Sequence, residues 1–205
     1  QMFSLRRQQG RLKEVAPLLQ HFVNSTPAEG TWRPGLALIY AELGMLDEAR
    51  IEFDQLASNG FSSIPEDSSW FNCMGMLAEV CHMLGDQRQA DALHQLLSPY
   101  AKGNIVAPPL VACYGSASRH LGLLATTLCR WDEAEQYFVA ALDLNERQGG
   151  RPWVAHTQHA HAAMLCERGN RADWDRAIAL NAAAAAIAGD LGMQGLVERA
   201  AALKE

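Results

Sequence analysis

The pattern of apolar and polar residues along the chain is that of helices. Apolar residues recur at helical spacing over most of the 205 residues, and no run alternates convincingly with a period of two. The sequence therefore predicts an all-α protein, with loops at 24–27, 60–69 and 98–109, where prolines occur. We expect helix pairs at 3–10 and 12–24, 33–43 and 46–58, 68–84 and 87–98, 110–128 and 131–147, and 152–168 and 173–190, with a closing helix at 193–204.

A short phrase recurs where the first helix of each expected pair turns into the second. It reads GMLDEA at 44–49 and CRWDEA at 129–134, with weaker copies GDQRQA at 85–90 and GRLKEV at 10–15 and an interrupted copy beginning at Gly169. Successive copies begin 34 to 44 residues apart. A period in this range is typical of solenoids of stacked helix pairs. The sequence thus predicts an α-α superhelix of about five helix pairs plus a closing helix, forming one domain over residues 1–205.

Each position of the phrase has a physical role. Glycine often ends a helix because the residue that follows the last helical one commonly takes a positive φ. Asp47 or Asp132 can cap the second helix, with Glu48 or Glu133 favourable near its N-terminal dipole. Cys129 stands where the other copies have glycine, so a different turn geometry is expected there.

Composition and charge make several classes of protein improbable for this chain. Hydrophobic residues make up 49% of the chain, the formal net charge is -6, and no run is rich in lysine or arginine. This balance argues against disorder and against direct binding of nucleic acid or an anionic membrane. No apolar run is long enough to span a bilayer. Five scattered cysteines without a CxxC pair indicate buried free thiols and a reducing, cytoplasmic setting.

Three of the seven histidines lie within the stretch GRPWVAHTQHAHAAML at 150–165. On a helix, His156 and His159 share a face, whereas His161 lies about 140° away from His156. Cys166 lies about 10.5 Å along the helix from His159, too far to complete a zinc site. The three histidines cannot bind one ion together, but a His156/His159 pair with a third ligand from another helix remains open.

Motifs that carry catalysis are missing from the sequence. There is no HEXXH glutamate, no G-x-S-x-G elbow, no GxxxxGK[ST] phosphate loop and no GxGxxG fingerprint. The stretch GSASRH at 115–120 resembles a nucleophile elbow only loosely, and its polar residues are more simply interhelical contacts. We therefore expect neither an enzyme nor a bound cofactor.

A binding surface is the function that remains. In solenoids of helix pairs, the first helix of each pair lines a concave groove. Core packing is the alternative for each single aromatic residue on those helices. The candidate groove residues are Tyr40, Glu42, Trp70, Asn72, Tyr114, Arg119, His120, His156 and His159.

The repeat phrases resemble tetratricopeptide repeats, especially the longer variety of about forty residues found in MalT-like regulators. From about Trp32 to Leu203 the resemblance is closer, through LLSPYAKGNIV (96–106), GSASRHLGLLA (115–125), WDEAEQYFVAALDLNERQGGRPWVAHTQ (131–158) and CERG (166–169). These phrases are similar to the C-terminal helical region of actinobacterial, particularly mycobacterial, regulators. Such regulators combine a signalling ATPase with an adenylate-cyclase-like or LuxR-type module.

The resemblance implies that the chain is the sensor or scaffold arm of a longer protein. The ATPase, cyclase and DNA-binding parts lie elsewhere in such proteins, so this segment inherits none of their catalytic or base-reading residues. The arm is expected to bind a partner or an inducer and so to restrain or release the ATPase.

Three functional hypotheses stay open. The first is a non-catalytic scaffold that binds a protein, either the regulator's own ATPase or effector domains or another protein. The second is a small-molecule sensor with an inducer near Tyr114, Arg119, His120 and His156. The third, with the least support in the sequence, is a metal-dependent or hydrolytic enzyme that uses His156 and His159.

Overall fold

The structure, a computed structural model, describes residues 2–25, 32–107 and 112–203. α-Helices make up most of it, so the prediction of an all-α protein is confirmed. Their bounds lie within a few residues of most of the expected ranges. The α-helices are α1 (Met2–Gln8), α2 (Ala16–Ser25), α3 (Arg33–Glu42), α4 (Leu46–Ala57), α5 (Trp70–Leu84), α6 (Gln87–Leu97), α7 (Ala117–Thr127), α8 (Trp131–Arg147), α9 (Arg151–Arg168), α10 (Trp174–Asp190) and α11 (Gln194–Ala202).

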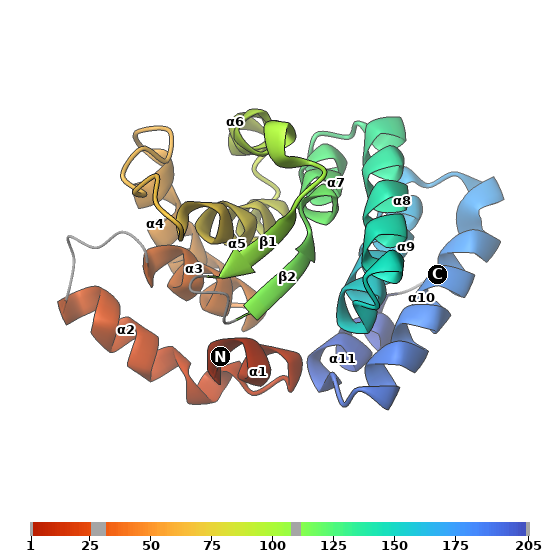
Figure 1. Cartoon of the computed structure of the whole chain (residues 1–205), viewed down its shortest axis with the longest axis horizontal. Helices are drawn as coiled ribbons and strands as arrows, with labels where there is room; N and C mark the ends of the chain where they lie inside the picture. Colours follow the sequence, from red (N-terminus) through yellow and green to blue (C-terminus); the bar gives the residue numbers. More distant parts are fainter. Residues whose placement is uncertain (1, 26–31, 108–111, 204–205) are drawn as a thin grey trace.

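The helices pack in pairs along the chain (Figure 1). α3 packs against α4, α5 against α6, α7 against α8, and α9 against α10. The first helices also contact one another in order, α3 with α5, α5 with α7, and α7 with α9. α11 packs on α10 and reaches α1, so the first and last helices of the described chain lie side by side at the bottom of Figure 1.

A β-hairpin between α6 and α7 contradicts the purely helical expectation. Strands β1 (Asn104–Ala107) and β2 (Ala112–Ser116) pair antiparallel, and α7 begins only at Ala117. The start of the helix expected at 110–128 was therefore wrong over 112–116, and residues 110 and 111 lie outside the described part. Ile105 and Ala107 are buried in alternate positions. Ile105 packs so closely on α5 that a Cβ on Gly75 would lie 2.6 Å from its Cδ1 atom.

The turns of the repeat phrase share one backbone geometry. Gly44, Gly85 and Gly169 have φ values of 76°, 65° and 69°, and Cys129 has 55°. The expectation of a different geometry at Cys129 is therefore wrong, because that residue takes the left-handed conformation that glycine adopts at lower cost.

The predicted aspartate caps are wrong at two helices. α4 and α8 begin one residue before Asp47 and Asp132, and neither N-cap residue, Met45 or Arg130, makes a side-chain cap hydrogen bond. The aspartates instead lie in the first turn, where the helix dipole favours negative charge. A true aspartate cap occurs at α6, where Asp86 Oδ1 accepts a hydrogen bond from the Gln89 amide at 3.0 Å.

All five cysteines are free thiols, but only part of the expected burial holds. Cys73 and Cys81 are buried, and burial raises the pKa of each thiol to about 12. Cys113 and Cys129 are exposed, because one lies on an outward position of β2 and the other at a turn. Cys166 is half-buried.

Candidate functional site

A buried network of ion pairs lies where the first helices of the pairs meet α1. Glu79 of α5 accepts hydrogen bonds from Arg7 of α1 and from Arg119 of α7, the latter at 2.8 Å between Nη2 and Oε1. Arg7 also donates through Nε and Nη2 to Glu42 Oε1 of α3, at 2.8 and 2.6 Å. Four side chains thus join four helices that are well separated in the sequence.

These four side chains are largely removed from water. Those of Arg7, Glu42, Glu79 and Arg119 are between 5% and 9% exposed. Burial by itself raises the pKa of Glu79, but Arg119 and Arg7 outweigh it and hold that pKa well below its ordinary value. Burial likewise opposes the charge of Arg7, yet Glu42 and Glu79 raise its pKa. Each charge therefore depends on its buried partners.

His120 touches the same carboxylate without carrying a charge. Burial, together with the positive Arg119 beside it, lowers the pKa of His120 to about 4. Because Arg119 Nη2 can only donate, the His120 Nε2 atom 2.9 Å away accepts a hydrogen bond from it. The Nδ1–H group then donates to the Ser116 carbonyl oxygen at 3.4 Å. A neutral imidazole thereby holds Arg119 in place for Glu79.

The chain's own terminal helices close this network. Gln8 Oε1 accepts a hydrogen bond from His156 Nε2 of α9 at 2.9 Å, and Arg199 of α11 lies 3.6 Å from Glu42. Figure 1 shows α1 beneath the hairpin, between α2 and α11. Arg119, His120 and His156 are 4%, 1% and 8% exposed. These three predicted groove residues are therefore buried in the fold and do not lie on an open surface.

Other predicted groove residues lie outside this network. Asn72 and Tyr114 line an apolar pocket between α1, α2, α3, α5 and the hairpin. Trp70 packs in an aromatic group with Tyr100, their ring centroids 5.8 Å apart. Tyr40 is half-buried on α3, and burial raises the pKa of its hydroxyl. The predicted groove residues therefore do not form one surface.

The three clustered histidines have three different neighbours. His156 reaches the N-terminal helix, His159 Nδ1 donates to Asn181 Oδ1 of α10 at 3.0 Å, and His161 stacks on Phe138 of α8 with ring centroids 5.5 Å apart. Burial lowers the pKa of all three imidazoles. Among the described residues, no group of three or more His, Cys, Asp or Glu side chains is arranged to hold a metal ion.

Arg7 and Glu79 are the residues of the network that sequence reasoning missed. Arg7 follows Phe3 by four residues and therefore lies on the same face of α1 as this aromatic side chain. Its place on the apolar face of a short helix was the one local indication that this arginine is buried. The partners of Arg7, Glu42 and Glu79, are 35 and 72 residues away along the chain, so the local sequence pattern could not predict these ion pairs.

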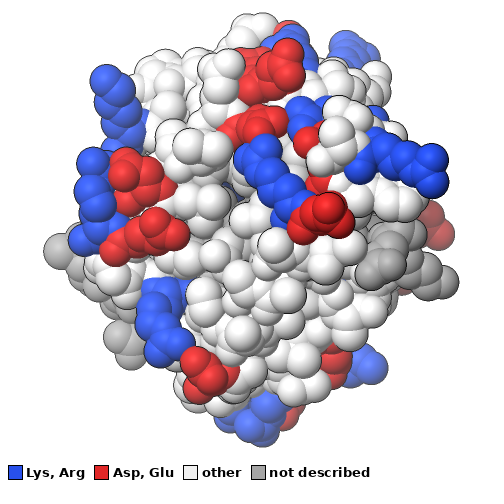
Figure 2. All heavy atoms as spheres, turned by 90° about the vertical axis from the view of Figure 1, so that its right-hand side faces the viewer, with Lys and Arg blue, Asp and Glu red and all other residues white. Residues whose placement is uncertain are grey.

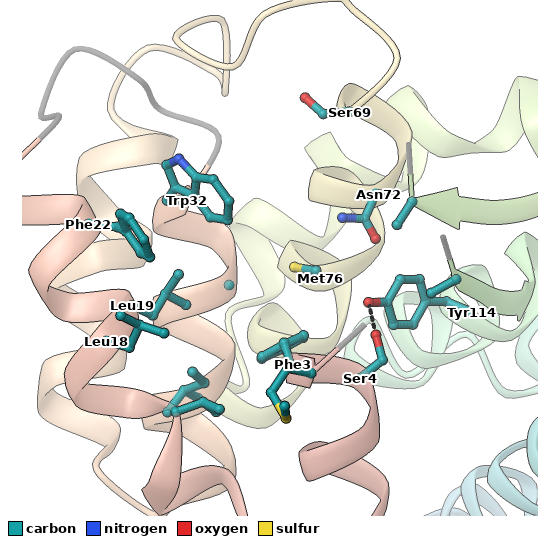
Figure 3. A pocket seen from close by; sticks show the side chains of 16 residues that line it. Phe3, Ser4, Leu18, Leu19, Phe22, Trp32, Ser69, Asn72, Met76 and Tyr114 are labelled. Carbon is teal, nitrogen blue, oxygen red and sulfur yellow. Dashed lines mark hydrogen bonds between the residues drawn. The ribbon is translucent and has the colours of Figure 1, made fainter. Parts of the chain in front are cut away.

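The apolar pocket has a volume of about 360 Å³ and is drawn in Figure 3. A second hollow lies between α10 and α11, where Asn181, the partner of His159, is part of its lining. Figure 2 shows the face built by the C-terminal helices, on which Lys and Arg lie beside Asp and Glu around an uncharged area. That face has no broad area of a single charge sign.

The fold places the chain among all-α proteins built from paired helices. Comparisons of the chain with protein-family models, curated proteins and solved structures gave no match. Family membership therefore rests on the phrases of the sequence and is a proposal. Within residues 2–25, 32–107 and 112–203, no helix is both long and apolar enough to cross a bilayer.

Proposed function

We propose that the chain is a non-catalytic helical-repeat arm that binds a helical segment of a protein within a larger signalling or transcriptional regulator. One observation carries the proposal, the docking of α1. This seven-residue helix is held through Arg7 between carboxylates of α3 and α5. The face lined by the first helices therefore holds a short helix, and Arg7 is the side chain of that helix that enters between the two carboxylates.

The chemistry of this docking suits exchange with a partner. The planar guanidinium group of arginine matches carboxylates in a fixed geometry, so Glu42 and Glu79 form a specific receptor for it. A helix as short as α1 is marginal on its own in water, so its position depends on docking. An arginine-bearing helix of a partner can take the place of Arg7 between the same two carboxylates.

The sequence resemblance suggests which partner this is. The tetratricopeptide-like phrases are similar to the helical arm of actinobacterial LuxR-type or adenylate-cyclase-like regulators. In such a protein the natural partner is the regulator's own ATPase or effector region, in the cytoplasm. Exchange of α1 for a helix of that region would then restrain or release the ATPase.

Cross-linking followed by mass spectrometry on the longer regulator tests this function. We expect cross-links between the ATPase region and α3 or α5, and more of them in an Arg7→Ala variant, in which Glu42 and Glu79 lose the arginine that they share. Arg6→Ala is the matched control, because Arg6 lies on the same helix but pairs with Glu14. Absence of cross-links, together with unchanged ATPase activity after deletion of the arm, contradicts the proposal.

A further inference from the structure

The apolar pocket beside α1 has the features of a small-molecule site. Its volume of about 360 Å³ lies within the usual range of ligand pockets, roughly 300–1,000 Å³. Its walls come from α1, α2, α3, α5 and the hairpin, elements distant in sequence. The pocket shares α1, α3 and α5 with the buried ion-pair network, but none of the four charged side chains of that network lines it.

One wall of the pocket is apolar and open to solvent. Phe22 and Trp32 stack with ring centroids 5.6 Å apart and an interplanar angle of 20°. They are 41% and 43% exposed, and Leu18 beside them is 57% exposed. Figure 3 shows these side chains on α2 and at the start of α3, with Leu19 beneath them. Large apolar side chains exposed together around a hollow are typical of a binding site.

The opposite wall holds the polar groups. Ser4 Oγ and Tyr114 Oη form a hydrogen bond at 2.6 Å, and Asn72 projects from α5 between this pair and Ser69 (Figure 3). The Oδ1 atom of Asn72 is buried and has no hydrogen-bond partner among the described residues. Buried carbonyl oxygens are nearly always paired in folded proteins, so this one calls for a partner. No charged side chain is among those that line the pocket.

We propose that this pocket binds a small, uncharged molecule with an apolar ring body and one hydroxyl group, the hydroxyl meeting Asn72. The ring body lies against Phe22 and Trp32. A hydroxyl both donates and accepts, so it pairs with either end of the Asn72 amide, whose oxygen and nitrogen exchange places by rotation about its last torsion. The uncharged lining excludes carboxylates, phosphates and ammonium groups, because nothing there compensates their desolvation.

Two compounds of nearly equal size test the proposal on the intact chain. 1-Naphthol carries the hydroxyl, and 1-methylnaphthalene replaces it with a methyl group. Titration calorimetry is expected to show binding of both, with 1-naphthol about tenfold tighter because it satisfies the Asn72 amide. In an Asn72→Leu variant the preference is expected to fall to about twofold or less, since the polar partner is gone.

A second variant asks whether the compounds enter this pocket. Ala112→Phe places a ring in the hollow from β2 and is expected to abolish binding of both compounds. Ala182→Phe is the matched control, because Ala182 lines the other hollow, near α11, and binding there should be unchanged. If Ala112→Phe does not fold by circular dichroism, the Asn72→Leu result decides.

Three results overturn the proposal. The first is that neither compound binds the wild-type chain. The second is equal binding of the two compounds to the wild type. The third is a preference for 1-naphthol that survives Asn72→Leu, or binding that survives Ala112→Phe in a folded protein.

Discussion

Glu79 and Glu135 each lie between two arginines, the first inside the fold and the second near the surface. Glu79 meets the arginines of α1 and α7, and its side chain is 9% exposed. Glu135 of α8 meets Arg168 of α9 at 2.9 Å and also Arg176 of α10, and its side chain is 26% exposed. The chemical groups are the same, so the comparison isolates the effect of burial.

The difference in burial determines what each cluster contributes to the stability of the fold. Near the surface, water and salt screen the charges, and the pairing adds little to stability. Inside, the charges have lost their hydration and each depends on its partners, so the loss of one partner leaves an uncompensated buried charge. The inner cluster therefore determines the position of α1. The outer cluster only adds ion pairs to helices that are already packed against one another.

The largest expected effect is that of Glu79→Gln. Removal of this carboxylate leaves two buried arginines with a neutral partner, and we expect the free energy of unfolding to fall by about 3–5 kcal/mol. Urea denaturation followed by circular dichroism measures it. A loss below about 1 kcal/mol, the size expected for an exposed pair, would mean that water reaches the inner cluster.

Acid is expected to weaken the inner region next. The pKa of His120 falls from 6.5 to about 4 on folding because of burial and Arg119, so its contribution to stability is complete above pH 6.5 and is lost as the pH falls toward 4. Unfolding free energy measured at a series of pH values should decline across this window. His120→Gln should make the decline shallower without removing it, because burial also lowers the pKa of His156, His159 and His161.

A backbone change at the turn before α8 is expected to alter the free energy of unfolding by more than the loss of an outer ion pair does. Cys129→Gly relieves a left-handed residue with a Cβ atom and should raise the free energy of unfolding by about 1 kcal/mol. Gly44→Ala is the mirror control, because φ is 76° there and no atom lies within 4 Å of an added Cβ. It should lower stability by a similar amount. Equal stability of both variants with the wild type would refute this account of the turns.

The smallest expected effect is that of Glu135→Gln. We expect a loss of about 0–1 kcal/mol at low salt, fading in 1 M salt because surface pairs are screened. The same denaturation experiment applied to both glutamate variants at two salt concentrations completes the comparison. If the loss for Glu135→Gln persists at high salt, the outer cluster behaves as a buried one.

Much of the helical arrangement could be predicted, because helix formation depends on the spacing of apolar residues over a few positions of the chain. The expected range 131–147 coincides with α8, and 46–58 exceeds α4 by one residue. The hairpin could not be predicted in the same way. Its strands have four and five residues, and the only period-two signal, Ile105 and Ala107, is too short to stand out.

The candidate site was predicted only in part. Asn72 and Tyr114 were expected on a binding surface, and both line the pocket. Leu18 and Phe22 were not expected there, since nothing in the sequence of α2 says which element its apolar side will meet. Arg119 and His120 were expected in an open groove and are instead buried around Glu79.

The sequence by itself determined the class of the fold, the phrases that end and begin its helices, and the absence of catalytic motifs. These properties depend on neighbours within a few positions along the chain. Tertiary structure alone decided that Arg7 enters between Glu42 and Glu79 and that an apolar hollow is left open beside α1. Both outcomes depend on which surfaces of distant helices pack together. They also depend on whether a charge buried between these surfaces has an ion-pair partner that compensates for its lost hydration.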